Sequence, residues 1–88
     1  TASGATILVV DDMEALRRII ARVLGARGYR VLSVENAAEA ERAASEEIHL
    51  LMTDAVLRRG DAREVVSRVR SRWPRVRVLY MSGYGEGA

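Results

Sequence analysis

The sequence IHLLMTD, residues Ile48–Asp54, is a short apolar run that ends in an aspartate. Its length and its charged flanks predict a strand buried on both faces, as in the centre of a parallel sheet. The carboxyl ends of such strands form the edge at which open α/β sheets bind ligands. A lone aspartate at this position can also simply end a strand, so Asp54 by itself does not indicate a site.

A second apolar run, Ala5–Val10, also leads directly into acid, namely Asp11 and Asp12. Parallel strands that both end in acid bring these residues to the same edge of the sheet. Three carboxylates gathered there repel one another unless protons or a cation compensate, and a hard divalent ion with oxygen ligands can do so. We therefore expect a functional site at this edge.

The rest of the chain predicts helices and strands in alternation. Further strands are expected at 29–34 and 76–81, and helices at about 13–27, from 37 to about 46, and at 62–73. Asn36 and Glu39 form a capping box for the second helix. The first helix is expected to have Asp12 as its N-cap and Gly28 just beyond its end. Leu16, Ile19, Ile20, Val23 and Leu24 form one apolar stripe along it, and its arginines are expected on the opposite, polar side.

The order β-α-β-α-β-α-β predicts an α/β fold, a doubly wound parallel sheet with helices on both faces. Residues 1–4 are small and polar, which is typical of the end of a linker, and residues 5–88 form one domain. The chain has no cysteine, which excludes disulfides, thiolate metal sites and thiol catalysis. No apolar run approaches the ~20 residues of a membrane span and no signal peptide is evident, so we expect a cytoplasmic location.

All fourteen basic residues are arginine, and the chain contains no lysine. The arginines are concentrated in residues 58–88, a segment that contains eight arginines and three acidic residues. A basic segment can bind nucleic acid, but these arginines are not interleaved with aromatic residues. We expect a solvated basic face rather than a nucleic-acid surface.

The chemistry that fits this edge is phosphoryl transfer. A carboxylate can act as the nucleophile while a metal ion offsets the charge of the transferring group. Ser82 directly follows the last predicted strand, where its hydroxyl can donate to a phosphoryl oxygen. The alternative from the residues alone is a Mg²⁺- or Ca²⁺-binding cluster with a purely structural use.

Three stretches together resemble the receiver domains of two-component response regulators: Ile7–Asp12 (ILVVDD), Leu51–Asp54 (LMTD) and Val78–Tyr84 (VLYMSGY). The last stretch is most similar to receivers of hybrid histidine kinases, and the resemblance covers essentially the whole chain. It implies a flavodoxin-like receiver fold. It also implies a phosphoryl group taken from the phosphohistidine of a sensor histidine kinase or a histidine phosphotransfer domain, in a signalling module that is not itself an enzyme.

The resemblance also assigns roles to residues. Asp54 would be the phosphoacceptor, and Ser82 would contact the phosphoryl group and move on activation. Asp12 and Asp54 would bind Mg²⁺ directly, together with the backbone carbonyl of Val56, while Asp11 would act mainly through water. His49 would not be a phosphoryl donor, because it lies at the far end of its strand; we expect it to be a strand-edge residue.

The sequence departs from the family pattern in two ways. Leu57, Arg58 and Ala62 stand where the family usually has Met, Pro and Gly. The family's fifth strand, its last two helices and the lysine that follows that strand have no counterpart here, so we expect a truncated receiver with strand order 2-1-3-4. Phosphorylation is expected to be impaired, and the uncovered surfaces predict a homo-oligomer.

Two other functions remain open from the sequence. The chain could be a receiver fragment that does not transfer phosphate and serves only in protein association. A Mg²⁺-dependent phosphohydrolase with an aspartyl nucleophile is the least favoured, because its nucleophile and acid should alternate after the first strand, whereas Asp11 and Asp12 are adjacent.

Overall fold

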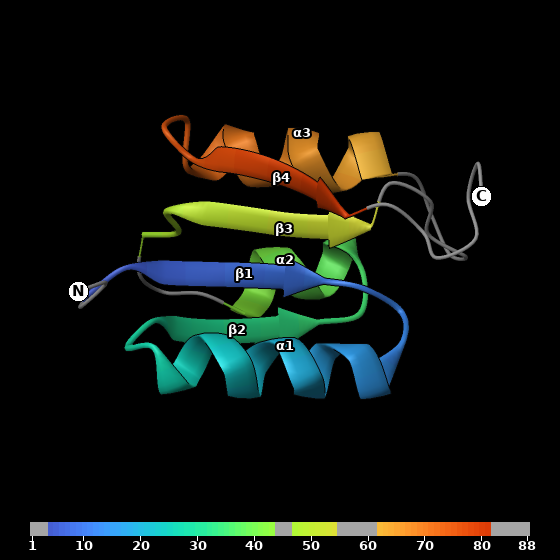
Figure 1. The fold of residues 1–88 in the computed structure, drawn as a ribbon. Helices are drawn as coiled ribbons and strands as arrows, with labels where there is room; N and C mark the ends of the chain where they lie inside the picture. Colours follow the sequence, from blue (N-terminus) through green and yellow to red (C-terminus); the bar gives the residue numbers. More distant parts are fainter. Residues whose placement is uncertain (1–3, 44–46, 55–61, 82–88) are drawn as a thin grey trace.

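The computed structural model describes residues 4–43, 47–54 and 62–81 (Figure 1). Within them, strands and helices alternate as β1 (Thr6–Val10), α1 (Glu14–Ala26), β2 (Arg30–Val34), α2 (Ala37–Ala43), β3 (Leu50–Asp54), α3 (Ala62–Arg72) and β4 (Arg77–Met81). The four strands are parallel and lie in the order β2-β1-β3-β4. The predicted doubly wound sheet and its strand order are therefore confirmed.

The two faces of the sheet are covered by different helices. Helices α2 and α3 pack on one face and α1 lies on the other (Figure 1). The main core lies between the sheet and the α2–α3 pair, and it includes Leu8, Leu51, Val65 and Trp73. The apolar residues of α3, namely Ala62, Val65, Val66 and Val69, are all buried, because this helix packs on β3 and against α2.

Helix α1 is only partly covered by the rest of the described structure. None of its residues is buried, and Ile19 and Val23 are 60% and 51% exposed. The apolar stripe is therefore present but only partly covered. Helix α1 packs on β2 and β1, and no other helix of the described residues packs on the same face of β3 and β4.

The ends of α1 confirm one predicted cap and correct the other. Gly28 has φ +96°, a left-handed conformation that glycine adopts without steric cost, and it lies just beyond the helix as predicted. Asp12 is not the N-cap. That position belongs to Met13, whose backbone N–H is bound by the side chain of Asp11.

The predicted capping box of α2 is present in a shifted form. Asn36 Oδ1 accepts a hydrogen bond from the Glu39 N–H at 2.9 Å, as a capping box requires. The Glu39 carboxylate binds the N–H of Glu35, one residue earlier than the usual partner, also at 2.9 Å. These two bonds hold the chain leaving β2 against the start of α2.

His49 lies at the amino end of β3, opposite the edge that carries the aspartates, so its prediction as a strand-edge residue is confirmed. Its backbone N–H donates to the carbonyl of Thr6 at 2.9 Å, and its carbonyl accepts from Arg77. Its Nδ1 accepts a hydrogen bond from the Thr6 N–H at 3.0 Å. The imidazole thus extends the hydrogen bonding between β1 and β3 by one bond.

We predict that His49→Ala lowers the free energy of unfolding by roughly 1 kcal/mol, because this acceptor is lost at the start of a central strand. His49→Asn is the matched control, since its Oδ1 can occupy the place of Nδ1 and should recover at least half of the loss. Urea titration measures both variants. Equal destabilisation by alanine and asparagine would contradict a role for this hydrogen bond.

Candidate functional site at the carboxyl edge of the sheet

The predicted aspartates lie together at the carboxyl ends of β1 and β3. Asp54 is the last residue of β3, and Asp11 and Asp12 directly follow β1. These two strands are paired, and Val10 lies beside Thr53. Asp11 and Asp54 are the next residues on each strand, so they are at the same level of the sheet. Val56 and Ser82, the other two predicted site residues, lie outside the described residues.

Asp11 is the buried member of the group, with 1% of its surface exposed. Its backbone N–H donates to the Val34 carbonyl at 3.1 Å, which extends the pairing of β1 with β2 by one residue. Its Oδ1 accepts a hydrogen bond from the Met13 N–H at 2.8 Å. Because both bonds fix the same residue, the turn from β1 into α1 is held in one conformation.

Burial raises the pKa of the Asp11 carboxyl above its ordinary value, because an ionised carboxylate is poorly solvated there. The N–H of Met13 and the nearby Arg17 act in the opposite direction, whereas the charges of Asp54 and Asp12 raise this pKa further. The carboxylates are therefore close enough to repel one another. Any bound cation would relieve this repulsion.

Arg17 is a residue of this edge that the sequence did not reveal. Its guanidinium Nη1 donates to the backbone carbonyl of Asp11 at 2.6 Å. The pattern of α1 had assigned the arginines to the polar side of the helix, facing solvent. One signal was available: Arg17 follows Asp11 by six residues, a spacing that lets a long side chain reach back over the first turn of the helix.

The donor set fits a hard divalent ion that uses few protein side chains. Among the described residues, no group of three or more His, Cys, Asp or Glu side chains is arranged to hold a metal ion. Mg²⁺ commonly binds through only one or two carboxylates and keeps several waters. Two carboxylates whose charges act on a buried third one are consistent with that mode.

Comparison with known proteins identifies the family. Residues 7–88 match the family described as response regulator receiver domain. The sensor kinase CckA of Brucella abortus is 30% identical over 90 residues, which cover 99% of this chain and 10% of that protein. The regulator NtrC of Rhizobium meliloti is 37% identical over 91% of this chain and 17% of its own length. The chain thus spans a small part of these two curated relatives.

Solved structures share the fold. The receiver domain of the hybrid histidine kinase CckA superposes with a TM-score of 0.79 at 34% identity, over 94% of this chain and 80% of that one. A response regulator from Burkholderia pseudomallei, solved with a phosphorylated aspartic acid and a calcium ion, gives 0.82 at 29% identity, over 92% and 48%.

TrrA of Thermotoga maritima, solved with Mg²⁺ and BeF, gives a TM-score of 0.77 at 25% identity, over 93% of this chain and 72% of that one. In its complex with the histidine kinase ThkA, the match gives 0.75 at 26% identity, over 92% and 71%. Since the family match covers nearly the whole sequence, this chain belongs to the response regulator receiver domain family.

Proposed function

We propose that this chain accepts a phosphoryl group on Asp54 from a phosphohistidine of a sensor histidine kinase or a phosphotransfer domain. The observation that carries the proposal is the place of Asp54 at the end of β3, beside the buried Asp11. The related receiver from Burkholderia pseudomallei contains a phosphorylated aspartic acid, and TrrA binds a histidine kinase. The module would accept phosphate in the cytoplasm without acting as an enzyme on a separate substrate.

In the proposed step, a carboxylate oxygen of Asp54 attacks phosphorus. A P–O bond forms, the P–N bond to the donor imidazole breaks, and the leaving nitrogen takes up a proton, which yields an acyl phosphate. Asp12, Asp54 and the Val56 carbonyl would hold Mg²⁺, with Asp11 acting through water, and Ser82 would contact the phosphoryl group. Bound Mg²⁺ would offset the charge of the phosphoryl oxygens.

We further propose that phosphorylation of the 88-residue chain is inefficient. The chain contains no lysine, so none of its side chains can supply an ammonium to the phosphoryl group. A charge-assisted hydrogen bond contributes roughly 1.5–3 kcal/mol. Its absence corresponds to about ten- to a hundredfold lower affinity for the phosphorylated state.

Incubation with acetyl phosphate and Mg²⁺, followed by intact-mass measurement, tests the assignment. We expect partial addition of one phosphoryl group, and none in Asp54→Asn. Glu47→Gln is the matched control, because it makes the same change at the opposite edge of the sheet, just before β3. Full modification that survives Asp54→Asn would show that another residue is the acceptor.

A second role, in association, is favoured by the exposed apolar residues. Ile19, Val23 and Leu79 are at least half exposed, and β4 lies at the edge of the sheet with β3 as its neighbour. Exposed apolar faces beside an open strand edge tend to recruit other chains. We propose that the 88-residue chain self-associates. Light scattering at micromolar concentration should give a mass above 9.7 kDa, and a monomeric mass would refute this role.

A further inference from the structure

The link between β1 and α1 is only three residues long, from Asp11 to Met13, and Asp12 is its middle residue. Hydrogen bonds fix this link on both sides of Asp12. On one side, Arg17 Nη1 donates to the Asp11 carbonyl at 2.6 Å. On the other side, the Met13 N–H donates to Asp11 Oδ1 at 2.8 Å. Because the Asp11 carbonyl belongs to the planar peptide unit that ends at the Cα of Asp12, holding this oxygen restricts the orientation of Asp12.

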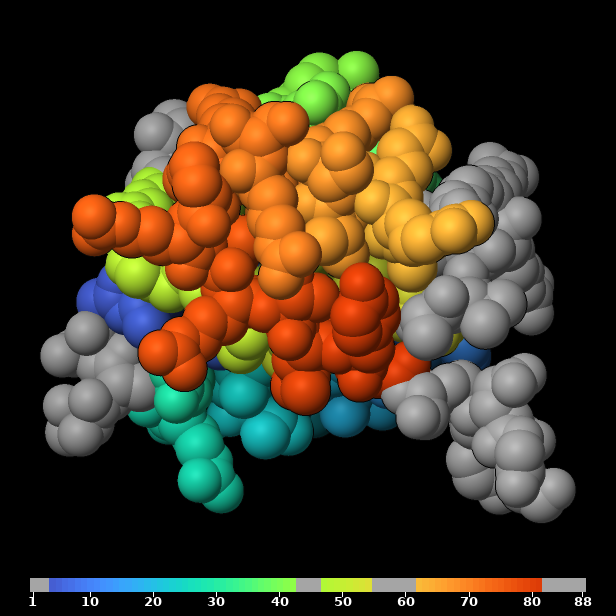
Figure 2. Space-filling view, turned by 90° about the horizontal axis from the view of Figure 1, so that it is seen from above, coloured from blue at the N-terminus to red at the C-terminus, as the bar shows by residue number. Residues whose placement is uncertain are grey.

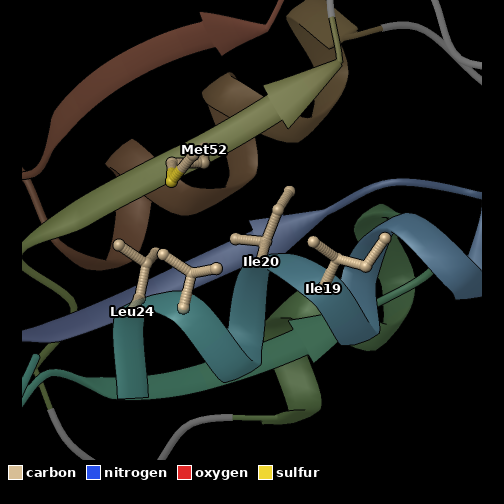
Figure 3. Close-up of a pocket in the computed structure, with 5 residues that line it drawn as sticks. Ile19, Ile20, Leu24 and Met52 are labelled. Atoms are coloured by element: carbon tan, nitrogen blue, oxygen red, sulfur yellow. The ribbon is translucent and has the colours of Figure 1, made fainter. Parts of the chain in front are cut away.

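Arg17 reaches this carbonyl because of its place on α1. It precedes Ile20 by three residues and Leu24 by seven, so it borders the side of the helix on which these two residues lie. Figure 3 shows Ile20 and Leu24 pointing from α1 towards the strand that carries Met52. Side chains on a helix lean towards its amino end, and Arg17 lies in the first turn. The partly buried Arg17 side chain is therefore directed at the end of β1.

The next arginine of α1 has a different environment. Arg18 pairs with Glu14 at 2.8 Å, and its side chain is 78% exposed. Arg17 instead bonds to the backbone of Asp11, a residue that is 1% exposed. Burial raises the pKa of the Asp11 carboxyl, whereas the Met13 N–H and the charge of Arg17 lower it. The Arg17 guanidinium thus acts on both the carbonyl and the carboxylate of Asp11, and a hydrogen bond from a charged donor is stronger than one from a neutral donor.

We propose that Arg17 is a positioning residue of the acid edge: by holding the Asp11 carbonyl, it keeps Asp12 in the orientation that binds Mg²⁺. The inference rests on the proposed function, in which Asp12 and Asp54 hold the ion, and it adds a residue that is not itself a ligand. Mg²⁺ demands near-octahedral coordination, so a carboxylate that is free to change orientation binds it less tightly. Loss of a residue that orients a metal ligand typically weakens metal binding about 10- to 100-fold.

The charge of Arg17 alone would have the opposite effect on Mg²⁺. A guanidinium beside carboxylates repels a divalent cation. If Arg17 acted only through its charge, its removal would therefore tighten Mg²⁺ binding. If Arg17 orients Asp12, its removal weakens the binding. The direction in which the Mg²⁺ dissociation constant changes separates these two roles.

An NMR titration of the 88-residue chain with Mg²⁺, followed at the amide signals of Asp12 and Met13, tests the proposal. Arg17→Met removes the donor and the charge but keeps a long side chain of similar helix propensity. It should raise the Mg²⁺ dissociation constant about 10-fold. Arg17→Lys restores a charged donor and should return this constant to within about threefold of the unchanged chain. Without Mg²⁺, hydrogen exchange at the Met13 amide should be faster in Arg17→Met, because one bond fewer holds the turn.

Two control variants make the same change elsewhere. Arg18→Met removes the neighbouring arginine of α1 together with its ion pair to Glu14. Arg68→Met removes an arginine of α3 that pairs with Glu41 of α2. Figure 2 shows α3 and α1 on opposite sides of β4, so Arg68 lies across the sheet from Arg17. Both controls should bind Mg²⁺ like the unchanged chain, and circular dichroism verifies that every variant is folded.

The possible results separate this inference from the proposed function. If the unchanged chain shows no Mg²⁺-dependent shifts, the proposed Mg²⁺ site is refuted and the role of Arg17 with it. Equal or tighter binding by folded Arg17→Met overturns the positioning role alone. A loss of affinity that Arg68→Met shares also overturns it, because general destabilisation would then be the cause. Weaker binding in Arg17→Met that Arg17→Lys restores, with both controls unchanged, supports the positioning role.

Discussion

Leu51→Ala is expected to lower the free energy of unfolding by about 2–5 kcal/mol, a range typical of buried leucines truncated to alanine. Leu51 is fully buried on the central strand β3, in the core beneath α2 and α3. A loss of this size removes a large part of the stability of a small domain. The substitution therefore tests whether this face of the sheet carries the main core.

Leu79→Ala is the matched control, because it makes the same chemical change on the adjacent strand β4. Leu79 is half exposed, so its truncation should cost less than about 1 kcal/mol. Urea titration followed by fluorescence of Trp73, the single tryptophan, measures both variants. This indole is buried in the core and stacked against Arg72, so unfolding changes its surroundings.

Equal costs at the two positions would contradict the asymmetric burial of the sheet.

The strand ends were predictable from sequence because they depend on local signals. The apolar runs in Ala5–Val10 and Ile48–Asp54 both end at an aspartate. Because the two strands are parallel, their carboxyl ends lie at the same edge of the sheet. The strand order also follows from the resemblance to a known family. The positions of Asp11, Asp12 and Asp54 therefore needed no information about packing.

The cover of α1 was not predictable in the same way. A period of 3.6 residues identifies which side chains share a face of the helix, but it does not show what lies opposite that face. Ile19 and Val23 share the stripe with Ile20 and Leu24, yet they extend beyond the part of the sheet that α1 covers. The extent of burial depends on the position of α1 relative to β3, which is a tertiary property.

The roles of the two adjacent aspartates were also decided by tertiary structure. Asp12 was the predicted cap of α1. In the structure, Asp11 accepts the hydrogen bond at the start of the helix, because its carboxylate turns inward and reaches the Met13 N–H. Arg17 was missed for a related reason: a long side chain on the polar part of a helix can fold back to a carbonyl of the preceding turn, as it does at Asp11.

Asp11→Asn is expected to raise the free energy of unfolding at neutral pH by roughly 1 kcal/mol, because it removes a buried charge that is repelled by its neighbours. The asparagine Oδ1 can still accept the hydrogen bond from the Met13 N–H. Asp11→Ala is the control: it also removes the charge but loses this acceptor, so it should be less stable than Asp11→Asn by about 1 kcal/mol.

The stability difference between Asp11→Asn and the unchanged chain should depend on pH. The folded pKa of Asp11 lies above its unfolded value, so its contribution to stability is fully present below the unfolded value and is lost as pH rises through the folded pKa. The advantage of Asp11→Asn over the unchanged chain should therefore shrink as pH falls to about 4, near the ordinary pKa of an aspartate. Urea titrations at neutral and acid pH measure the difference.

Mg²⁺ should stabilise the unchanged chain, which is the less stable of the two proteins without the ion, more than it stabilises Asp11→Asn. A divalent ion relieves the repulsion among Asp11, Asp12 and Asp54, so it should raise the melting temperature of the unchanged chain more than that of Asp11→Asn. The negative charge of Asp11 would then lower stability in the absence of Mg²⁺ and strengthen Mg²⁺ binding when the ion is present. An advantage of Asp11→Asn that is constant at every pH, with an equal response to Mg²⁺, would show that the Asp11 charge is not the cause.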